Sequence, residues 1–238
     1  MARDTIEDRI DGLDWSAIGE ELAERGYARI PRLLRPLECR ALIALYPDDE
    51  RFRSRIDMAR YRFGEGSYAY FREPLPEAVT ALRTGLYPRL APIANGMMTA
   101  LGRELRYPAA LQAFRRQCRA AGQTRPTPLL LHYTAGGYNR LHRDLYGPLA
   151  FPLQATAMLS RRGSDYTGGE FLLVENVARQ QSRGEAIAAE QGDLIVFPGR
   201  ERPVAGKRGP LRVELRHGMS RVHSGERYAL GIIFHDAE

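Results

Sequence analysis

The chain has 238 residues, of which 44% are hydrophobic, and its formal net charge is +6. This length and composition suit one domain with a sizeable core, and no apolar run approaches the length that a membrane-spanning helix needs. The N-terminal residues carry acids where a signal peptide would be basic and then apolar, and Cys39 and Cys118 form no disulfide framework, so we expect a cytoplasmic protein with reduced thiols.

The positive charge comes almost entirely from arginine, with 34 Arg against one Lys. Such a ratio indicates genomic base composition more than selection for phosphate contacts, so we look to local clusters. Residues 51–72 hold six Arg among several Tyr and Phe, and residues 106–125 hold five Arg and no acid. Both clusters fit a solvated surface, but aromatics beside cations also suit a nucleic-acid groove.

The first half of the chain is predicted to be mainly helical. Asp14 can cap a helix that carries Trp15, Ile18 and Leu22 at helical spacing, and Pro36 can open a second helix. Residues 77–86, 89–102 and 109–120 predict three more helices. Residues 51–72 are rich in Arg, Tyr and Gly and predict a loop or a short hairpin.

After Pro128 the pattern changes to short strands separated by glycine turns. We expect strands over residues 129–133, 153–160, 169–175, 185–189, 193–197, 212–217 and 227–234. Seven or eight antiparallel strands suggest a jelly roll, which gives an α+β fold with N-terminal helices buttressing one outer sheet. We therefore divide the chain into residues 1–125, mainly helical support with a substrate-side segment, and residues 126–238, the core.

A histidine and an aspartate two residues apart, His142 and Asp144, follow a glycine turn. In an extended segment such residues point to the same side, so a strand end could offer one ion an imidazole and a carboxylate while Arg143 points away. A second histidine from a distant strand would complete the ligand set of a non-heme Fe(II) oxygenase, which leaves coordination positions open. An isolated HxD triplet is a weak signal, since it often occurs by chance.

Three later histidines compete for the remaining ligand position. His217 ends a strand-like run, His223 sits in a turn beside Ser224-Gly225, and His235 is close to the end of the chain, where we expect it to be frayed or to act as a cap. We favour His217, with His223 as the alternative. His132 precedes the triplet and fits a strand residue with a satisfied hydrogen bond.

Several motifs in order along residues 128–236 resemble the Fe(II)/2-oxoglutarate-dependent dioxygenases, and in their spacing the prolyl-4-hydroxylase-like branch. The matching stretches are residues 133–144, 168–171, 192–197 and 217–227. The resemblance implies that His142, Asp144 and His217 hold iron. It also implies that Arg227 binds the C5 carboxylate of 2-oxoglutarate and that the Tyr133 hydroxyl is a partner to that carboxylate.

The whole chain also resembles a bacterial subfamily of oxygenases that act on damaged nucleic acid, through residues 60–64, 86–95, 122–128 and 230–236. Two departures bear on the substrate. The R-x-N-x-T-x-R run of AlkB-type demethylases lacks its second arginine here, where Ile233 stands, and the proline that hydroxylases carry before the Val-x-x-Gly turn is replaced by Ser220-Arg221. Asp144, in place of glycine, argues against a halogenase.

We therefore expect an oxidoreductase that uses Fe(II), 2-oxoglutarate and O₂, with ascorbate in support, and needs no catalytic residue beyond the metal ligands. It would hydroxylate or oxidatively demethylate a C–H bond and release succinate and CO₂. The primary substrate is either modified nucleic acid or an amino acid, peptide or metabolite, and a jelly-roll binding module without turnover is the non-enzymatic alternative. The residues expected on the substrate side are Arg60, Arg62, Tyr70 and Tyr146.

Overall fold

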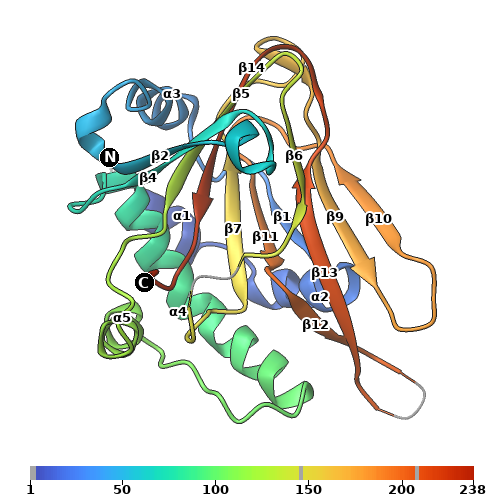
Figure 1. Ribbon diagram of the computed structural model, residues 1–238. Helices are drawn as coiled ribbons and strands as arrows, with labels where there is room; N and C mark the ends of the chain where they lie inside the picture. The colour runs from blue at the N-terminus through green and yellow to red at the C-terminus, as the bar shows by residue number, and fades with distance from the viewer. Residues whose placement is uncertain (1–3, 145–146, 207–208) are drawn as a thin grey trace.

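Two antiparallel sheets face each other and form the centre of the molecule. A computed structural model describes residues 4–144, 147–206 and 209–238. One sheet has eight strands and the other six, and we call them the large and the small sheet. In Figure 1 the small-sheet strands β6, β9, β10 and β13 lie on the right, α1, α3 and α5 lie on the left, and the large sheet stands between them. The expected α+β jelly roll with buttressing helices is confirmed.

The large sheet has the strand order β1-β11-β7-β14-β5-β4-β2, and β8 pairs beside β14. Its strands are β1 (Ala28–Ile30), β2 (Phe52–Asp57), β4 (Ser67–Phe71), β5 (Leu129–Thr134), β7 (Leu153–Met158), β8 (Tyr166–Gly168), β11 (Leu194–Pro198) and β14 (Val222–Ile232). Residues before 125 therefore supply strands as well as helices. β14 begins at Val222, so His223 belongs to a strand and not to the expected turn.

The small sheet has the order β10-β9-β13-β6-β3, and β12 pairs with β13. Its strands are β3 (Gly64–Glu65), β6 (Tyr138–His142), β9 (Phe171–Asn176), β10 (Arg183–Ile187), β12 (Glu201–Val204) and β13 (Leu211–Met219). The segment 52–71 thus forms an edge of both sheets, because β2 ends the large sheet and β3 ends the small one. This segment carries the predicted hairpin. Its strands β2 and β4 are antiparallel, with Phe52 opposite Phe71 and Asp57 opposite Ser67.

The helices are α1 (Ile6–Asp11), α2 (Trp15–Arg25), α3 (Pro36–Ala44), α4 (Glu77–Ala100) and α5 (Leu111–Ala120), with short 3-10 turns η1 (Asp49–Arg51) and η2 (Ala59–Tyr61). The predicted start of α2 is confirmed, since the Asp14 carboxylate accepts hydrogen bonds from the backbone N–H groups of Ser16 and Ala17. Among the described residues, no helix is long and apolar enough to cross a membrane.

Helix α4 is one helix where the sequence predicted two, and it contains Pro88 and Pro92. An interior proline removes a hydrogen bond and costs about 3 kcal/mol. Leu82, Leu86 and Leu90 repeat at four-residue spacing and are fully buried against the rest of the core. Burial of each leucine stabilises the fold by roughly 1.5–3 kcal/mol, so together the three leucines offset a cost of the size that two prolines impose.

Alternation along the central strands separates a helix-facing side from an interior side. Leu230 and Ile232 of β14 pack in the main core cluster beneath the helices, together with Ala155 and Ala157 of β7. The residues that alternate with them on β14, Ala229 and Gly231, line an internal cavity. Since successive side chains of a strand point to opposite faces, the large sheet presents one face to the helices and the other to the space between the sheets.

Candidate active site

His142, Asp144 and His217 come together at the inner face of the small sheet. His142 on β6 and His217 on β13 are register partners in an antiparallel pair. Asp144 Oδ1 lies 3.5 Å from His142 Nε2, and Asp144 Oδ2 lies 3.3 Å from His217 Nε2. One ligand atom from each of the three residues lies within 4.8 Å of the others. The geometry therefore gathers two imidazoles and one carboxylate at a single point.

The two imidazole rings are oriented by different means. His142 Nδ1 lies 2.7 Å from the carbonyl oxygen of Arg140. A carbonyl can only accept, so Nδ1 carries the proton and Nε2 keeps its lone pair, which is the arrangement that metal-ligating histidines use. The His217 ring packs against Phe197 at 4.8 Å and Phe171 at 6.1 Å between centroids. His217 Nδ1 has no hydrogen-bond partner among the described residues, so these rings and the contact of Nε2 with Asp144 Oδ2 at 3.3 Å hold the imidazole.

The electrostatics of the cluster favour the protonation states that bind a cation. Burial by itself raises the pKa of the Asp144 carboxyl, but the neighbouring His217 and His142 and the Gln154 amide outweigh it and hold the pKa below its usual range. Burial and the adjacent His217 lower the pKa of His142. An ionised carboxylate beside a neutral imidazole is the state that a divalent metal requires of its ligands.

Arg227 is a buried cation without a carboxylate partner among the described residues. It is 4% exposed, and its Nε has no hydrogen-bond partner there. One terminal nitrogen lies 3.1 Å from Met158 Sδ, a weak acceptor. The guanidinium carbon lies 5.9 Å from the ring centre of Tyr133 and 5.8 Å from that of Tyr166. A charge held in this way calls for an anion from outside the chain, because burying it unpaired is costly.

The three-residue cluster and Arg227 open on one cavity of about 470 Å³, a size typical of small-molecule sites. Its walls include Leu129, Leu131, Ala229 and Ile233, which lie on β5, on β14 and just beyond it. Tyr133 also lines it, is 1% exposed, and has its pKa raised by burial. The interior is therefore an apolar chamber with a candidate metal cluster and a cation in its walls.

The residues expected on the substrate side are only partly brought together. Tyr70 and Arg62 line the cavity, whereas Arg60 is not among its lining residues. Tyr146 lies outside the described residues. Tyr68 lines the cavity beside Tyr70 and was missed by the sequence analysis, although two tyrosines separated by one residue on a strand point to the same side.

The remaining histidines are not members of the cluster. His223 is exposed, and His132 stacks on Tyr228 with 4.3 Å between ring centres. His235 is 5% exposed and accepts a hydrogen bond from the backbone N–H of Phe151 at Nδ1, so the expectation of a frayed residue was wrong. A second cavity of about 390 Å³ has His235 in its wall and shares Asp144 and Gln154 with the first.

A jelly roll with a His-Asp-His cluster in its interior defines the class as a candidate metal-dependent protein of the double-stranded β-helix type. The sequence of residues 66–237 matches the Oxygenase-NA family, which is described as "Oxygenase, catalysing oxidative methylation of damaged DNA". The chain belongs to this oxygenase family, and it is accordingly an oxidoreductase.

The chain is also similar to an uncharacterized protein of Mycobacterium tuberculosis, with 51% identity over 164 residues, which are 69% of this chain and 70% of the relative. Among solved structures, a Trichoplax adhaerens prolyl hydroxylase bound to a hypoxia inducible factor peptide has a TM-score of 0.60 at 14% identity, covering 99% of this chain and 94% of that one. A Pseudomonas putida prolyl-4-hydroxylase has a TM-score of 0.53 at 17% identity, covering 94% and 100%. At these identities the two structures bear out the fold alone.

Proposed function

We propose that this oxygenase depends on Fe(II) and 2-oxoglutarate and hydroxylates or oxidatively demethylates a C–H bond of its substrate. One observation carries the proposal: the buried Arg227, with no carboxylate partner among the described residues, lines the same cavity as His142, Asp144 and His217. A dicarboxylate with an oxo group at one end has the charges to engage both features at once.

The residues of the cluster fit ferrous iron. Two neutral imidazole nitrogens and one carboxylate are the donor set of non-heme iron centres, which retain open positions for a cosubstrate. The Nε2 atoms of both histidines lie beside the Asp144 oxygens, and His142 has its other nitrogen occupied by a backbone carbonyl. We assign His142, Asp144 and His217 as the metal ligands.

When bound, iron with 2-oxoglutarate and O₂ supplies the oxidising chemistry, in which the oxo acid becomes succinate and CO₂. The chain's own residues bind, orient and exclude water. Arg227 would form a charge-assisted ion pair with the distal carboxylate, which its planar guanidinium can hold through two hydrogen bonds. Tyr133 would add a hydroxyl donor. Leu129, Leu131 and Ala229 would keep water away from the carbon chain of the cosubstrate.

The proposed primary substrate is modified DNA. The family description names damaged DNA, and the arginine-rich segment 51–72 borders the cavity through Arg62 and Phe63. Hydroxylation of a methyl group on a base nitrogen gives an unstable product that releases the methyl carbon as formaldehyde.

The free, buried thiols of Cys39 and Cys118 are compatible with our proposal of a cytoplasmic location.

The test is conversion of 2-oxoglutarate to succinate with Fe(II) and ascorbate, first alone and then with methylated single-stranded DNA. We expect slow conversion alone, and faster conversion with formaldehyde release when the DNA is added. Variants His142→Ala and Arg227→Ala should each abolish the conversion. Unchanged conversion in both variants would refute the assigned site. Stimulation by an amino acid or peptide in place of DNA would support the reaction but replace the substrate.

A further inference from the structure

Exposed apolar and basic side chains gather beside the cavity in a group that we call the mouth patch, made up of Arg60, Tyr61, Arg62, Phe63, Arg140 and Leu141. Tyr61 is 49% exposed, Phe63 48% and Leu141 41%. Among the described residues, Tyr61 and Phe63 are the two aromatics in the set of exposed large hydrophobic side chains. Their rings stack with 5.6 Å between centres and 19° between planes. Two exposed stacked rings offer a flat face to a planar ligand.

The turn that carries these rings is held in place by its backbone. The N–H groups of Tyr61 and Phe63 both donate to the carbonyl of Met58, whose side chain is 1% exposed. Arg62 has φ 61°, a left-handed conformation that closes the turn. The N–H of Arg140 donates to the carbonyl of Phe63, which ties the turn to strand β6. The stacked rings therefore stand on an ordered support before any ligand arrives.

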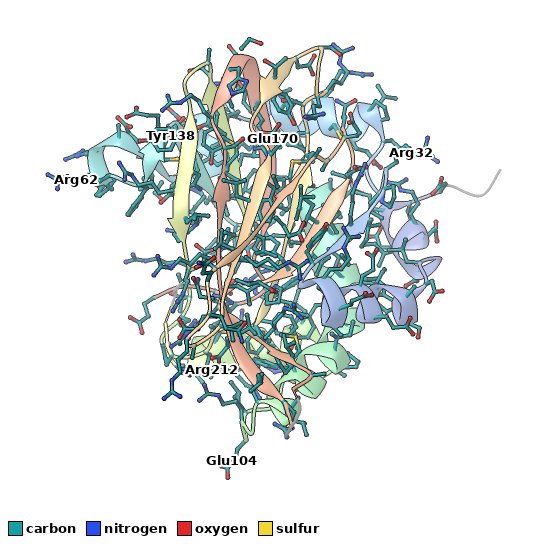
Figure 2. The ribbon with its side chains drawn as sticks, turned by 90° about the vertical axis from the view of Figure 1, so that its right-hand side faces the viewer. Arg32, Arg62, Glu104, Tyr138, Glu170 and Arg212 are labelled. Atoms are coloured by element: carbon teal, nitrogen blue, oxygen red, sulfur yellow. The ribbon has the colours of Figure 1, made fainter. Side chains whose placement is uncertain are left out.

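The positive charges of the mouth patch are not neutralised within the described residues. Arg60, Arg62 and Arg140 have no ion pair there, whereas Arg51 and Arg55 of the same segment pair with Asp48 and Asp49. In Figure 2 the labelled Arg62 projects from one edge of the molecule. The acidic residues of segment 52–71 are Asp57 and Glu65, and Asp57 is engaged by the backbone N–H of Ala59. The six residues of the mouth patch include three arginines and no acidic residue, so the patch itself carries an excess of positive charge.

The mouth patch is continuous with the interior of the site. Arg62, Phe63, Arg140 and Leu141 line the same cavity as His142. Leu141 directly precedes His142 on β6, and Arg140 supplies the carbonyl that orients the His142 ring. A chain molecule that enters the cavity with one unit would therefore pass over the patch with the next ones.

We propose that the mouth patch binds single-stranded DNA, with a base stacked on Tyr61 and Phe63 and neighbouring phosphates paired with Arg60, Arg62 and Arg140. This inference rests on the proposed DNA substrate and adds the surface that holds the strand. Stacking on aromatics combined with arginine contacts to the backbone is how proteins grip single strands. A single strand suits the site because the target base must leave its stack to enter the cavity.

Binding of a fluorescently labelled single-stranded oligonucleotide to the 238-residue chain, followed by anisotropy, tests the proposal. Replacing both rings, as Tyr61→Ala with Phe63→Ala, should weaken binding by about 10-fold or more. Tyr61→Leu with Phe63→Leu keeps the apolar bulk and should weaken binding similarly, which guards against a folding defect. The matched control is Leu37→Ala with Leu211→Ala, two exposed residues outside the patch. Equal affinity of the ring variants and the wild type would overturn the proposal.

The salt dependence tests the charges separately. Replacing Arg60, Arg62 and Arg140 by Gln should flatten the slope of log K against log salt by up to about 2, since each phosphate contact on a single strand contributes about 0.7. The control replaces Arg40, Arg116 and Arg119, exposed arginines elsewhere, and changes the net charge equally. The same flattening in the control would mean that binding follows overall charge, and the proposal would fail.

Failure of this inference is distinguishable from failure of the proposed function. A wild-type protein that converts 2-oxoglutarate to succinate but binds no single strand would retain its oxygenase assignment and lose the mouth patch as a DNA surface. A protein that binds the strand through the patch yet makes no succinate would retain the surface and lose the proposed reaction.

Discussion

His142 and His217 are register partners across the antiparallel strands β6 and β13, and their ring centres lie 4.3 Å apart. The two residues are far apart in sequence, so strand pairing, and not local chain geometry, brings the imidazoles together. A slip of one residue in this pairing would turn one ring to the opposite face of the sheet. The candidate metal cluster therefore depends on the register of the small sheet.

Removing either register partner should abolish metal binding. We expect His142→Ala and His217→Ala to lower the affinity for Mn(II), a redox-stable probe, by more than about 100-fold, since even residues that only support a ligand are worth 10–100-fold. Isothermal titration calorimetry measures the affinity. His223→Ala is the matched control, because His223 is exposed and lies outside the cluster. Equal loss in the control, or none in the variants, would refute the ligand assignment.

Replacing Arg227 by Met should have opposite effects on stability and on cosubstrate binding. Burying a charge without a partner is costly, so the free protein with an apolar side chain of similar size at this position should melt at the same or a higher temperature. The wild type should gain roughly 2.7 kcal/mol from 2-oxoglutarate at 100 times its Kd, with Mn(II) present, and the variant should gain almost none. Thermal unfolding without and with 2-oxoglutarate measures both the stability of the free proteins and the stabilisation that the cosubstrate gives. Equal stabilisation of both proteins would contradict the assigned role.

Phe197 is predicted to be a positioning residue for His217. Its ring packs 4.8 Å from that imidazole, which has no hydrogen bond at Nδ1 among the described residues. We expect Phe197→Leu to lower Mn(II) affinity by about 10-fold, in the range seen when the support of a ligand is lost. Phe114→Leu, at a buried site on α5, provides the control for a general packing defect. If both variants lose equal stability and neither loses metal affinity, Phe197 has no positioning role.

His235 should give the fold a defined loss of stability in mild acid. Burial, followed by the nearby Arg83 charge, lowers its pKa to about 4. The unfolded imidazole has a pKa near 6.5, so protonation favours the unfolded chain. The contribution is complete above about pH 6.5 and is lost as the pH falls towards 4, by at most about 3 kcal/mol.

The variant His235→Asn keeps an acceptor for the Phe151 N–H but does not titrate in this range. Its free energy of unfolding, measured by urea denaturation between pH 7 and pH 4, should fall less steeply than that of the wild type. His223→Asn changes an exposed histidine and should follow the wild type. Parallel curves for wild type and His235→Asn would contradict the prediction.

Local signals predicted those parts of the fold that local chemistry decides. Asp14 and Pro36 marked true helix starts, and the glycine turns separated true strands. The HxD spacing predicted that His142 and Asp144 would lie together, because alternation along an extended chain needs no knowledge of the fold. The choice of His217 over His223 followed from its place at the end of a strand-like run.

Features that depend on tertiary packing could not be predicted from the sequence. The sequence predicted separate helices over residues 77–86 and 89–102, but α4 continues through Pro88 because its leucine face is buried beneath the large sheet. His235 reads as a terminal residue, yet the chain end is held inside by Arg83, which donates to the carbonyls of Ile233 and Phe234. Such contacts join residues distant in sequence, and no local pattern reports them.

The strands β13 and β14, which carry His217 and Arg227, are the middle strands of the two sheets, whereas segment 52–71 forms an edge of both. A middle strand is bonded on both sides, so a change there disturbs its neighbours, while an edge has a free side. Substitutions that change which molecule is bound can therefore accumulate along this edge without altering the proposed iron and 2-oxoglutarate site. The fold therefore allows substrate specificity to change at the edge while the middle strands β13 and β14 stay the same.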